Sequence, residues 1–189
     1  MLKLKLKISA LLLLITSINT YGQFFEIYQA VNVEKYQGKN FSLEGKIFYK
    51  DAITNASWLV LAARSINSNG KQQKATLYND NASDYYKNGD WSHYELTGKI
   101  DKDAKTLGVG ITIAGSGSYY VDDLKLFVKD GNNKIEIPLQ NSGFENDSLK
   151  NWNSFNLDKN TKLKLTKDKS LQANKLCLLT IQALRLHLN

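Results

Sequence analysis

The side chains that could carry catalysis are few, and they lie far apart in the sequence. His93 and His187 are the two imidazoles, and Cys177 is the single thiol. A zinc site needs roughly three or four ligands at workable spacing, and a nucleophilic cysteine needs a base packed beside it. Because neither pattern is present, the sequence predicts no catalytic apparatus in this chain. We expect His93 to be a surface residue of its strand.

Gly115-Ser116-Gly117-Ser118 is the stretch closest in composition to a serine nucleophile motif. A nucleophile elbow requires Gly-x-Ser-x-Gly between a strand and a helix. Here the serines lie between two predicted strands, so we assign the segment to a turn.

Asp122 and Asp123 are the most suggestive acids, because they lie inside a predicted strand. Side chains alternate between the two sides of a strand, so the two carboxylates are expected to point in opposite directions. Glycosidase chemistry needs two carboxyl groups that flank one bond. The pair is therefore not predicted to be catalytic.

A binding site is the more promising chemistry. Sugar rings pack their C–H groups on aromatic faces, while charged or amide groups beside the ring bind the hydroxyls. Trp58 and Arg64 share one face of a predicted strand and suit such a site. Tyr85, Tyr86 and Tyr119 lie in or near predicted loops and could form its rim. These five residues are candidate ligand-binding residues, and a buried Trp58 is an equally open alternative.

Short strands must position these candidates. Phe41, Leu43 and Ile47 alternate with polar residues, which is the pattern of a half-buried strand. Similar strands recur at about ten-residue spacing and are separated by turns rich in Asn, Gly and Ser. The sequence therefore predicts an all-β fold, an antiparallel β-sandwich with a jelly roll as the leading architecture.

Residues 1–22 have the pattern of a signal peptide. Lys3, Lys5 and Lys7 precede a short apolar run over residues 8–15, and small residues precede Gln23. The apolar run has about half of the ~20 residues that a membrane span needs. We expect a secreted or periplasmic protein with no membrane contact after cleavage.

The net positive charge of the chain comes from its two ends. Residues 23–149 hold 14 basic and 16 acidic side chains, whereas residues 150–189 hold 8 and 2. A nucleic-acid binder would place a basic stripe on its folded face. We therefore expect no nucleic-acid partner.

Five short motifs occur in a meaningful order. They are Gln29-x-Val31-x-Val33, Tyr36-x-Gly38-Lys39-x-Phe41-x-Leu43-x-Gly45, Gly89-x-Trp91-x-x-Tyr94, Leu107-Gly108-Val109-Gly110 and Tyr120-Val121-Asp122-Asp123-Leu124. In this order they resemble a galactose-binding-like carbohydrate-binding module over residues 25–128. The resemblance implies a β-jelly roll that serves secreted hydrolases as a noncatalytic accessory. It also implies core positions for Trp91 and Tyr94 and a structural role for Asp122, with a structural calcium ion as a lesser alternative.

A second resemblance begins after residue 138. Asn141-Ser142-Gly143-Phe144-Glu145, followed by Trp152, is similar to the opening strand of another such module. We therefore divide the chain into a sandwich at 23–137 and a truncated second module, or an irregular tail, at 138–189. A C-terminal helix over residues 176–186 is a further open interpretation.

Two functions follow as hypotheses. The first is a secreted noncatalytic module that binds a carbohydrate or a cell-surface polymer. The second is an accessory N-terminal domain of a secreted serine peptidase or erythromycin-esterase-like hydrolase whose catalytic domain is absent from this sequence.

Overall fold

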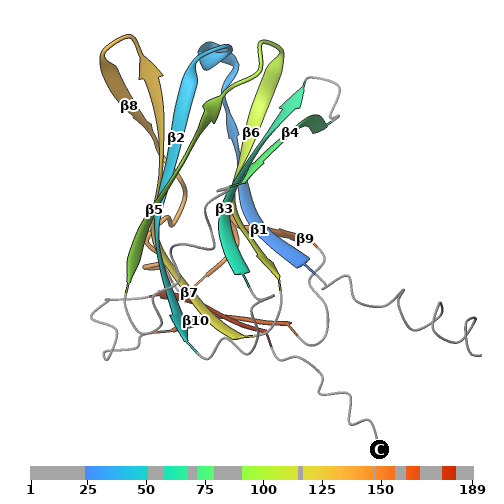
Figure 1. The fold of residues 1–189 in the computed structure, drawn as a ribbon, viewed down its shortest axis with the longest axis vertical. Coiled ribbons are helices and arrows are strands. Elements are labelled where there is room, and N and C mark those ends of the chain that lie inside the picture. Colours follow the sequence, from blue (N-terminus) through green and yellow to red (C-terminus); the bar gives the residue numbers. More distant parts are fainter. Residues whose placement is uncertain are drawn as a thin grey trace, which may run out of the picture.

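The computed structural model describes residues 24–50, 58–67, 72–78, 91–114, 117–146, 148–155, 161–166 and 176–181. These residues form two antiparallel β-sheets that lie face to face (Figure 1). Sheet A has the order β4-β3-β6-β1-β9, and sheet B has the order β10-β11-β7-β2-β5, with β8 paired to β7. The strands are β1 Phe24–Asn32, β2 Asn40–Lys50, β3 Trp58–Asn67, β4 Gln72–Tyr78, β5 Ser92–Lys99, β6 Ala104–Ala114, β7 Gly117–Asp130, β8 Asn133–Ile137, β9 Asn153–Phe155, β10 Thr161–Thr166 and β11 Leu176–Ile181.

The chain crosses repeatedly between the two sheets. It enters sheet A at β1, passes to sheet B at β2, returns for β3 and β4, and crosses again at β5, β6 and β7. Such crossings are typical of jelly rolls. The predicted all-β antiparallel sandwich is confirmed.

One core lies between the sheets, and alternating side chains fill it. On β2 the predicted residues Phe41, Leu43 and Ile47 are buried, and on β6 the buried residues include Leu107 and Val109. Each such side chain stabilises the fold by about 1.5–3 kcal/mol relative to an exposed position. The period-two pattern therefore fixes which side of each strand faces inward.

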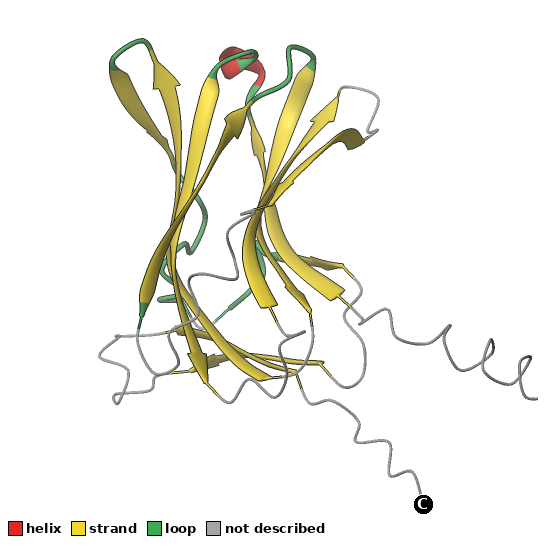
Figure 2. Cartoon of the chain, in the orientation of Figure 1, coloured by secondary structure: helices red, strands yellow, loops and turns green. Residues whose placement is uncertain are grey.

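A short 3-10 helix, η1 (Glu34–Tyr36), turns the chain from β1 to β2 (Figure 2). Within it, the Tyr36 N–H donates to the Val33 carbonyl at 2.8 Å. Both Val33 and Tyr36 are buried in the core. Gly38 follows with a φ of 72°, a left-handed value that favours glycine.

The expected alternation of Asp122 and Asp123 fails at a β-bulge. Val121 and Leu124 are both in the core, so two residues instead of one separate them. On β2 the register shifts between Glu44 and Lys46 at the same place, and Asp123 has a φ of 54°. A bulge changes the direction of side chains in this way. Asp122 and Asp123 therefore do not alternate as two neighbours on a regular strand would.

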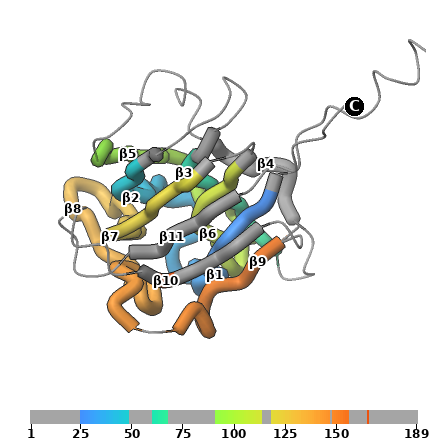
Figure 3. The backbone as a smooth tube through the Cα atoms, turned by 90° about the horizontal axis from the view of Figure 1, so that it is seen from below, coloured from blue at the N-terminus to red at the C-terminus, as the bar shows by residue number. Residues whose placement is uncertain are grey.

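Residues 138–155 close one side of the sandwich. The Gln29 side chain of β1 binds the Gln140 backbone through two hydrogen bonds of 2.5 and 2.9 Å. Leu124 N–H of β7 donates to the Ser142 carbonyl at 3.2 Å. Figure 3 shows the orange segment running from β8 to β9, which lies beside β1. The segment therefore bridges sheet A and sheet B.

Asn141 organises the turn within this segment. Its side chain accepts from Asn146 N–H at 2.9 Å and donates to the Ser148 carbonyl at 2.9 Å. Its own carbonyl accepts from the Trp152 indole at 3.4 Å. The Trp152 ring lies 5.2 Å from that of Phe144, and both are buried in the common core. The division at residue 137 stays a prediction, but in this fold the two parts share one core.

The two chain ends bear on further predictions. Residues 176–181 form β11, which pairs with β7, so the interpretation of this stretch as a helix is wrong. The predicted signal peptide lies outside the described residues. Within the described part of the chain, no helix has the length and apolar character that a membrane span requires.

Candidate functional site

Sheet A carries aromatic and polar residues on the side that faces away from the core. On β1, Glu26 and Tyr28 alternate with the core residues Phe25 and Ile27. Antiparallel register places residues of neighbouring strands directly beside them. This side is termed the outer face of sheet A, and its members include Glu26, Tyr28, Ala30, Val60, Ala62, Arg64, Gly108, Gly110, Thr112, Asn153 and Phe155. Tyr28, Ala30, Asn153 and Phe155, on its β1 and β9 strands, are the more exposed of these, whereas its central residues are buried or nearly so.

A nearly buried ion pair lies in the middle of this face. The Arg64 guanidinium contacts the Glu26 carboxylate, and only 12% and 4% of the two side chains are exposed. The Thr112 hydroxyl lies 3.2 Å from the other carboxylate oxygen and donates to it. Buried charges must be compensated, and here each charge has its partner. The pair therefore fixes the orientation of Arg64 and adds no net charge to the outer face of sheet A.

The Tyr28 ring lies against the same arginine. The guanidinium carbon of Arg64 is 5.6 Å from the ring centroid, within the range of a cation–π contact. Gly108 makes room for both side chains, because a Cβ there would lie 3.2 Å from Arg64 Cγ and 3.7 Å from Tyr28 Cδ2. Tyr28 remains half-buried. An oriented aromatic ring is thus held beside fixed polar groups.

Arg64 is the one predicted binding residue that the structure places in this site. Trp58 begins β3 at a register position beside Ala114, but its side chain is outside what the structure describes. Tyr85 and Tyr86 also lie outside the described residues. The structure therefore brings Arg64 together with Tyr28 and Glu26, which the sequence analysis did not select.

The prediction for Tyr119 is wrong. β7 begins at Gly117, so Tyr119 already lies in a strand and not in a loop. It alternates in step with the core residue Val121, and none of its surface is exposed. A residue in this position cannot contact a ligand.

Trp91 and Tyr94 occupy different environments. Tyr94 is buried in the core from β5. Trp91 precedes β5, is half-buried, and lies 5.6 Å from the Phe48 ring. Phe48 in turn makes an edge contact with Tyr120 at 5.4 Å. Tyr94 therefore has the core position that the resemblance implied, whereas Trp91 packs against Phe48 outside the core.

Asp122 faces the closing segment. Its carboxylate accepts from Asp123 N–H at 2.8 Å and lies close to Gly143. Burial raises its pKa to about 6, the Asp123 N–H opposes this rise, and the charges of Asp123 and Glu145 add to it. The Asp122 carboxyl group therefore binds a proton at a higher pH than an ordinary aspartate does.

The structural calcium ion that the resemblance offered as a lesser alternative stays a prediction. Calcium takes about six to eight oxygen ligands, which include backbone carbonyls. Asp147 of the same segment lies outside the described residues. Among the described residues, no group of three or more His, Cys, Asp or Glu side chains is placed to hold a metal.

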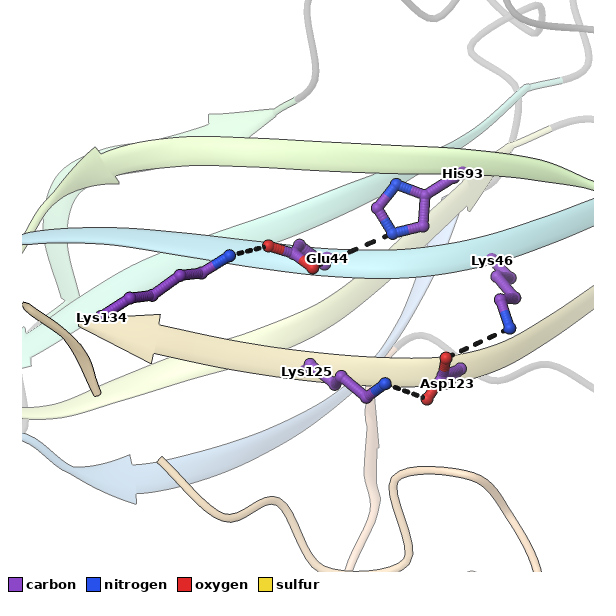
Figure 4. Close-up of polar contacts among 6 residues, drawn as sticks. All are labelled: Glu44, Lys46, His93, Asp123, Lys125 and Lys134. Atoms are coloured by element: carbon purple, nitrogen blue, oxygen red, sulfur yellow. Dashed lines mark hydrogen bonds and ion pairs between the residues drawn. The ribbon is translucent and has the colours of Figure 1, made fainter. Parts of the chain in front are cut away.

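The outward side of sheet B has a different chemistry (Figure 4). Asp123 binds Lys125 at 2.9 Å and Lys46 at 3.2 Å. Glu44 binds Lys134 and lies 3.9 Å from the exposed His93. This outer face of sheet B thus combines ion pairs with aromatic side chains, since Phe48 and Tyr120 pair on the same side and Lys134 lies over the Phe127 ring.

The sequence contains a signal for the residues that were missed. Glu26 and Tyr28 alternate with apolar residues in the stretch Phe25-Glu26-Ile27-Tyr28, as half-buried strands do. Pairing with Gly108 and Gly110 could not be read from that pattern. Phe155 carried no signal, since a three-residue strand shows no periodicity.

Comparisons with known proteins add one structural neighbour. No family model matches the sequence, and no curated protein is significantly similar to it. The fold is similar to the CBM22-1 xylan-binding domain from Paenibacillus barcinonensis Xyn10C, with a TM-score of 0.36 and 11% identity. The similarity covers 52% of this chain and 62% of that domain, which is less than two thirds of its length.

Proposed function

We propose that this protein is a noncatalytic carbohydrate-binding protein whose ligand lies on the outer face of sheet A. The observation that carries the proposal is the half-buried Tyr28 ring, held by Arg64 beside the Glu26 carboxylate. A sugar ring packs its C–H groups on such a ring. The guanidinium of Arg64, whose side chain is 12% exposed, can donate to a hydroxyl beside the ring, while the nearly buried Glu26 fixes the orientation of the guanidinium. The N-terminal pattern supports action outside the cytoplasm.

Binding to a panel of polysaccharides tests this function. The chain from residue 23 is titrated with mixed-linkage glucan, galactomannan, arabinan, polygalacturonate and alginate. Tyr28→Ala is expected to weaken binding of the preferred polymer at least about tenfold, which is ~1.4 kcal/mol. The loss of the stacking surface is the physical reason, because the polar pair remains in place.

Lys125→Ala is the matched control, since it removes an exposed side chain from the outer face of sheet B. It should bind as the wild type does, and both variants should keep the wild-type circular dichroism spectrum. Absence of binding to every polymer, or equal binding by Tyr28→Ala and wild type, would refute the proposal. The first outcome would favour the accessory-domain hypothesis.

A further inference from the structure

Phe155 is a large apolar side chain that stands out on the described surface. Half of it is exposed, whereas the other large hydrophobic residues described are buried or half-buried. A lone exposed phenylalanine is ordinary in a soluble protein. Its significance therefore depends on where it lies.

The strand register places Phe155 beside the proposed site. β9 is the edge strand of sheet A, and Phe155 pairs directly with Glu26 of β1. Directly paired residues point to the same side of a sheet. Glu26 in turn pairs with Thr112 of β6. With strands about 4.8 Å apart, Phe155 lies one strand beyond Tyr28 at the edge of the outer face of sheet A, whereas Glu26 and Thr112 in the same row are buried.

The charges on this face favour an uncharged ligand. Glu26 and Arg64 neutralise each other, and both are nearly buried. Ala30, Gly108 and Thr112, which lie around them, carry no charge. An acidic polysaccharide would need a cationic side chain that is not already in an ion pair. If its negative groups bound Arg64 instead, they would break the buried Arg64–Glu26 pair at considerable cost.

We propose that Phe155 provides a second sugar-stacking position, so that a neutral polysaccharide chain contacts Tyr28 and Phe155 along the β1–β9 edge of the outer face of sheet A. This inference rests on the proposed function and deepens it. The segment after residue 138 then contributes to the binding site as well as to the core.

Isothermal titration with oligosaccharides of increasing length tests the inference. Monosaccharides, disaccharides and tetrasaccharides are prepared from the neutral polymer that binds best. Because Phe155 lies one strand from Tyr28, Phe155→Ala should weaken disaccharide and tetrasaccharide binding about fivefold to tenfold and leave monosaccharide binding unchanged, whereas Tyr28→Ala should weaken binding at every length. Phe155→Trp is the conservative variant and should restore the long-chain affinity. Affinity should also be independent of salt concentration.

Two results would overturn the inference while the proposed function stands. One is wild-type affinity of Phe155→Ala for every length, which would remove the second position. The other is preferred, salt-sensitive binding of alginate or polygalacturonate, which would remove the neutral class. Lack of binding to any sugar would overturn the proposed function and this inference together.

Discussion

Asp122 and Asp123 are neighbours on β7, yet their carboxylates lie in different environments. Burial raises the pKa of Asp122 to about 6. Burial also acts on Asp123, but hydrogen bonds from Lys125 and Lys46 outweigh it and lower the pKa of Asp123. The bulge separates the two side chains, one toward the closing segment and the other toward the lysines.

Asp122→Asn is expected to stabilise the fold above about pH 6. The folded pKa exceeds the unfolded value of 3.8, so the folded state binds the proton more tightly and loses stability as pH rises between these values. Removing the charge recovers on the order of 1 kcal/mol after allowance for solvent screening. Thermal unfolding should show a Tm a few degrees higher near pH 8 and unchanged near pH 4.

Asp123→Asn is the matched variant and should change the Tm in the opposite direction. Its lowered folded pKa contributes stability above the unfolded pKa, and this is lost as pH falls through the folded value. Asparagine tolerates the positive φ at this position, so the backbone is preserved. If the two variants changed the Tm near pH 8 by the same amount and in the same direction, the environments assigned to Asp122 and Asp123 would be contradicted.

Prediction of single residues from sequence succeeded where the residue lay on a regular strand. Arg64 could be assigned to a face because β3 alternates through that position. Tyr119 was assigned wrongly because β7 already begins at Gly117, inside the glycine-rich stretch that the composition assigns to a turn. The alternation argument failed at Asp122 and Asp123, because a bulge leaves no periodic signal.

At the scale of elements, β1 and β6 approach each other unusually closely at Gly110. A Cβ on this residue would lie 1.9 Å from the Ile27 carbonyl oxygen and 2.8 Å from Tyr28 Cα. Both contacts are with backbone, which cannot yield as a flexible side chain would. The close pairing holds Tyr28 at its place on the outer face of sheet A.

Gly110→Ala should therefore destabilise the fold by at least about 2 kcal/mol, as expected for substitutions that force backbone strain. Urea unfolding monitored by fluorescence measures the loss. Gly143→Ala is the control, because a Cβ there would meet its neighbours at 3.7 Å or more. Equal stability of Gly110→Ala and wild type would show that the two strands are not paired in this register.

At the scale of the whole molecule, the sandwich is completed by a segment that the sequence assigned to another module. Phe144 and Trp152 enter the common core, and β9 extends sheet A at the edge strand β1. The resemblance of the segment from Asn141 to Trp152 to the opening strand of a module could be seen in the sequence. That resemblance carries no information on which sheet the segment joins. Alternation and the two-sheet architecture could be predicted, because they follow from local patterning. Long-range pairings could not, since they depend on complementarity between distant segments.

The central claim is that the outer face of sheet A binds the ligand, and backbone amide chemical shifts during a carbohydrate titration test it most directly. With the best-binding soluble oligosaccharide, the account predicts that the largest perturbations fall on Tyr28, Arg64 and Phe155 and their strand neighbours. The amides of Lys46 and Lys125 on the outer face of sheet B should remain unchanged. Perturbations centred on sheet B, or none at saturating ligand, would contradict the claim.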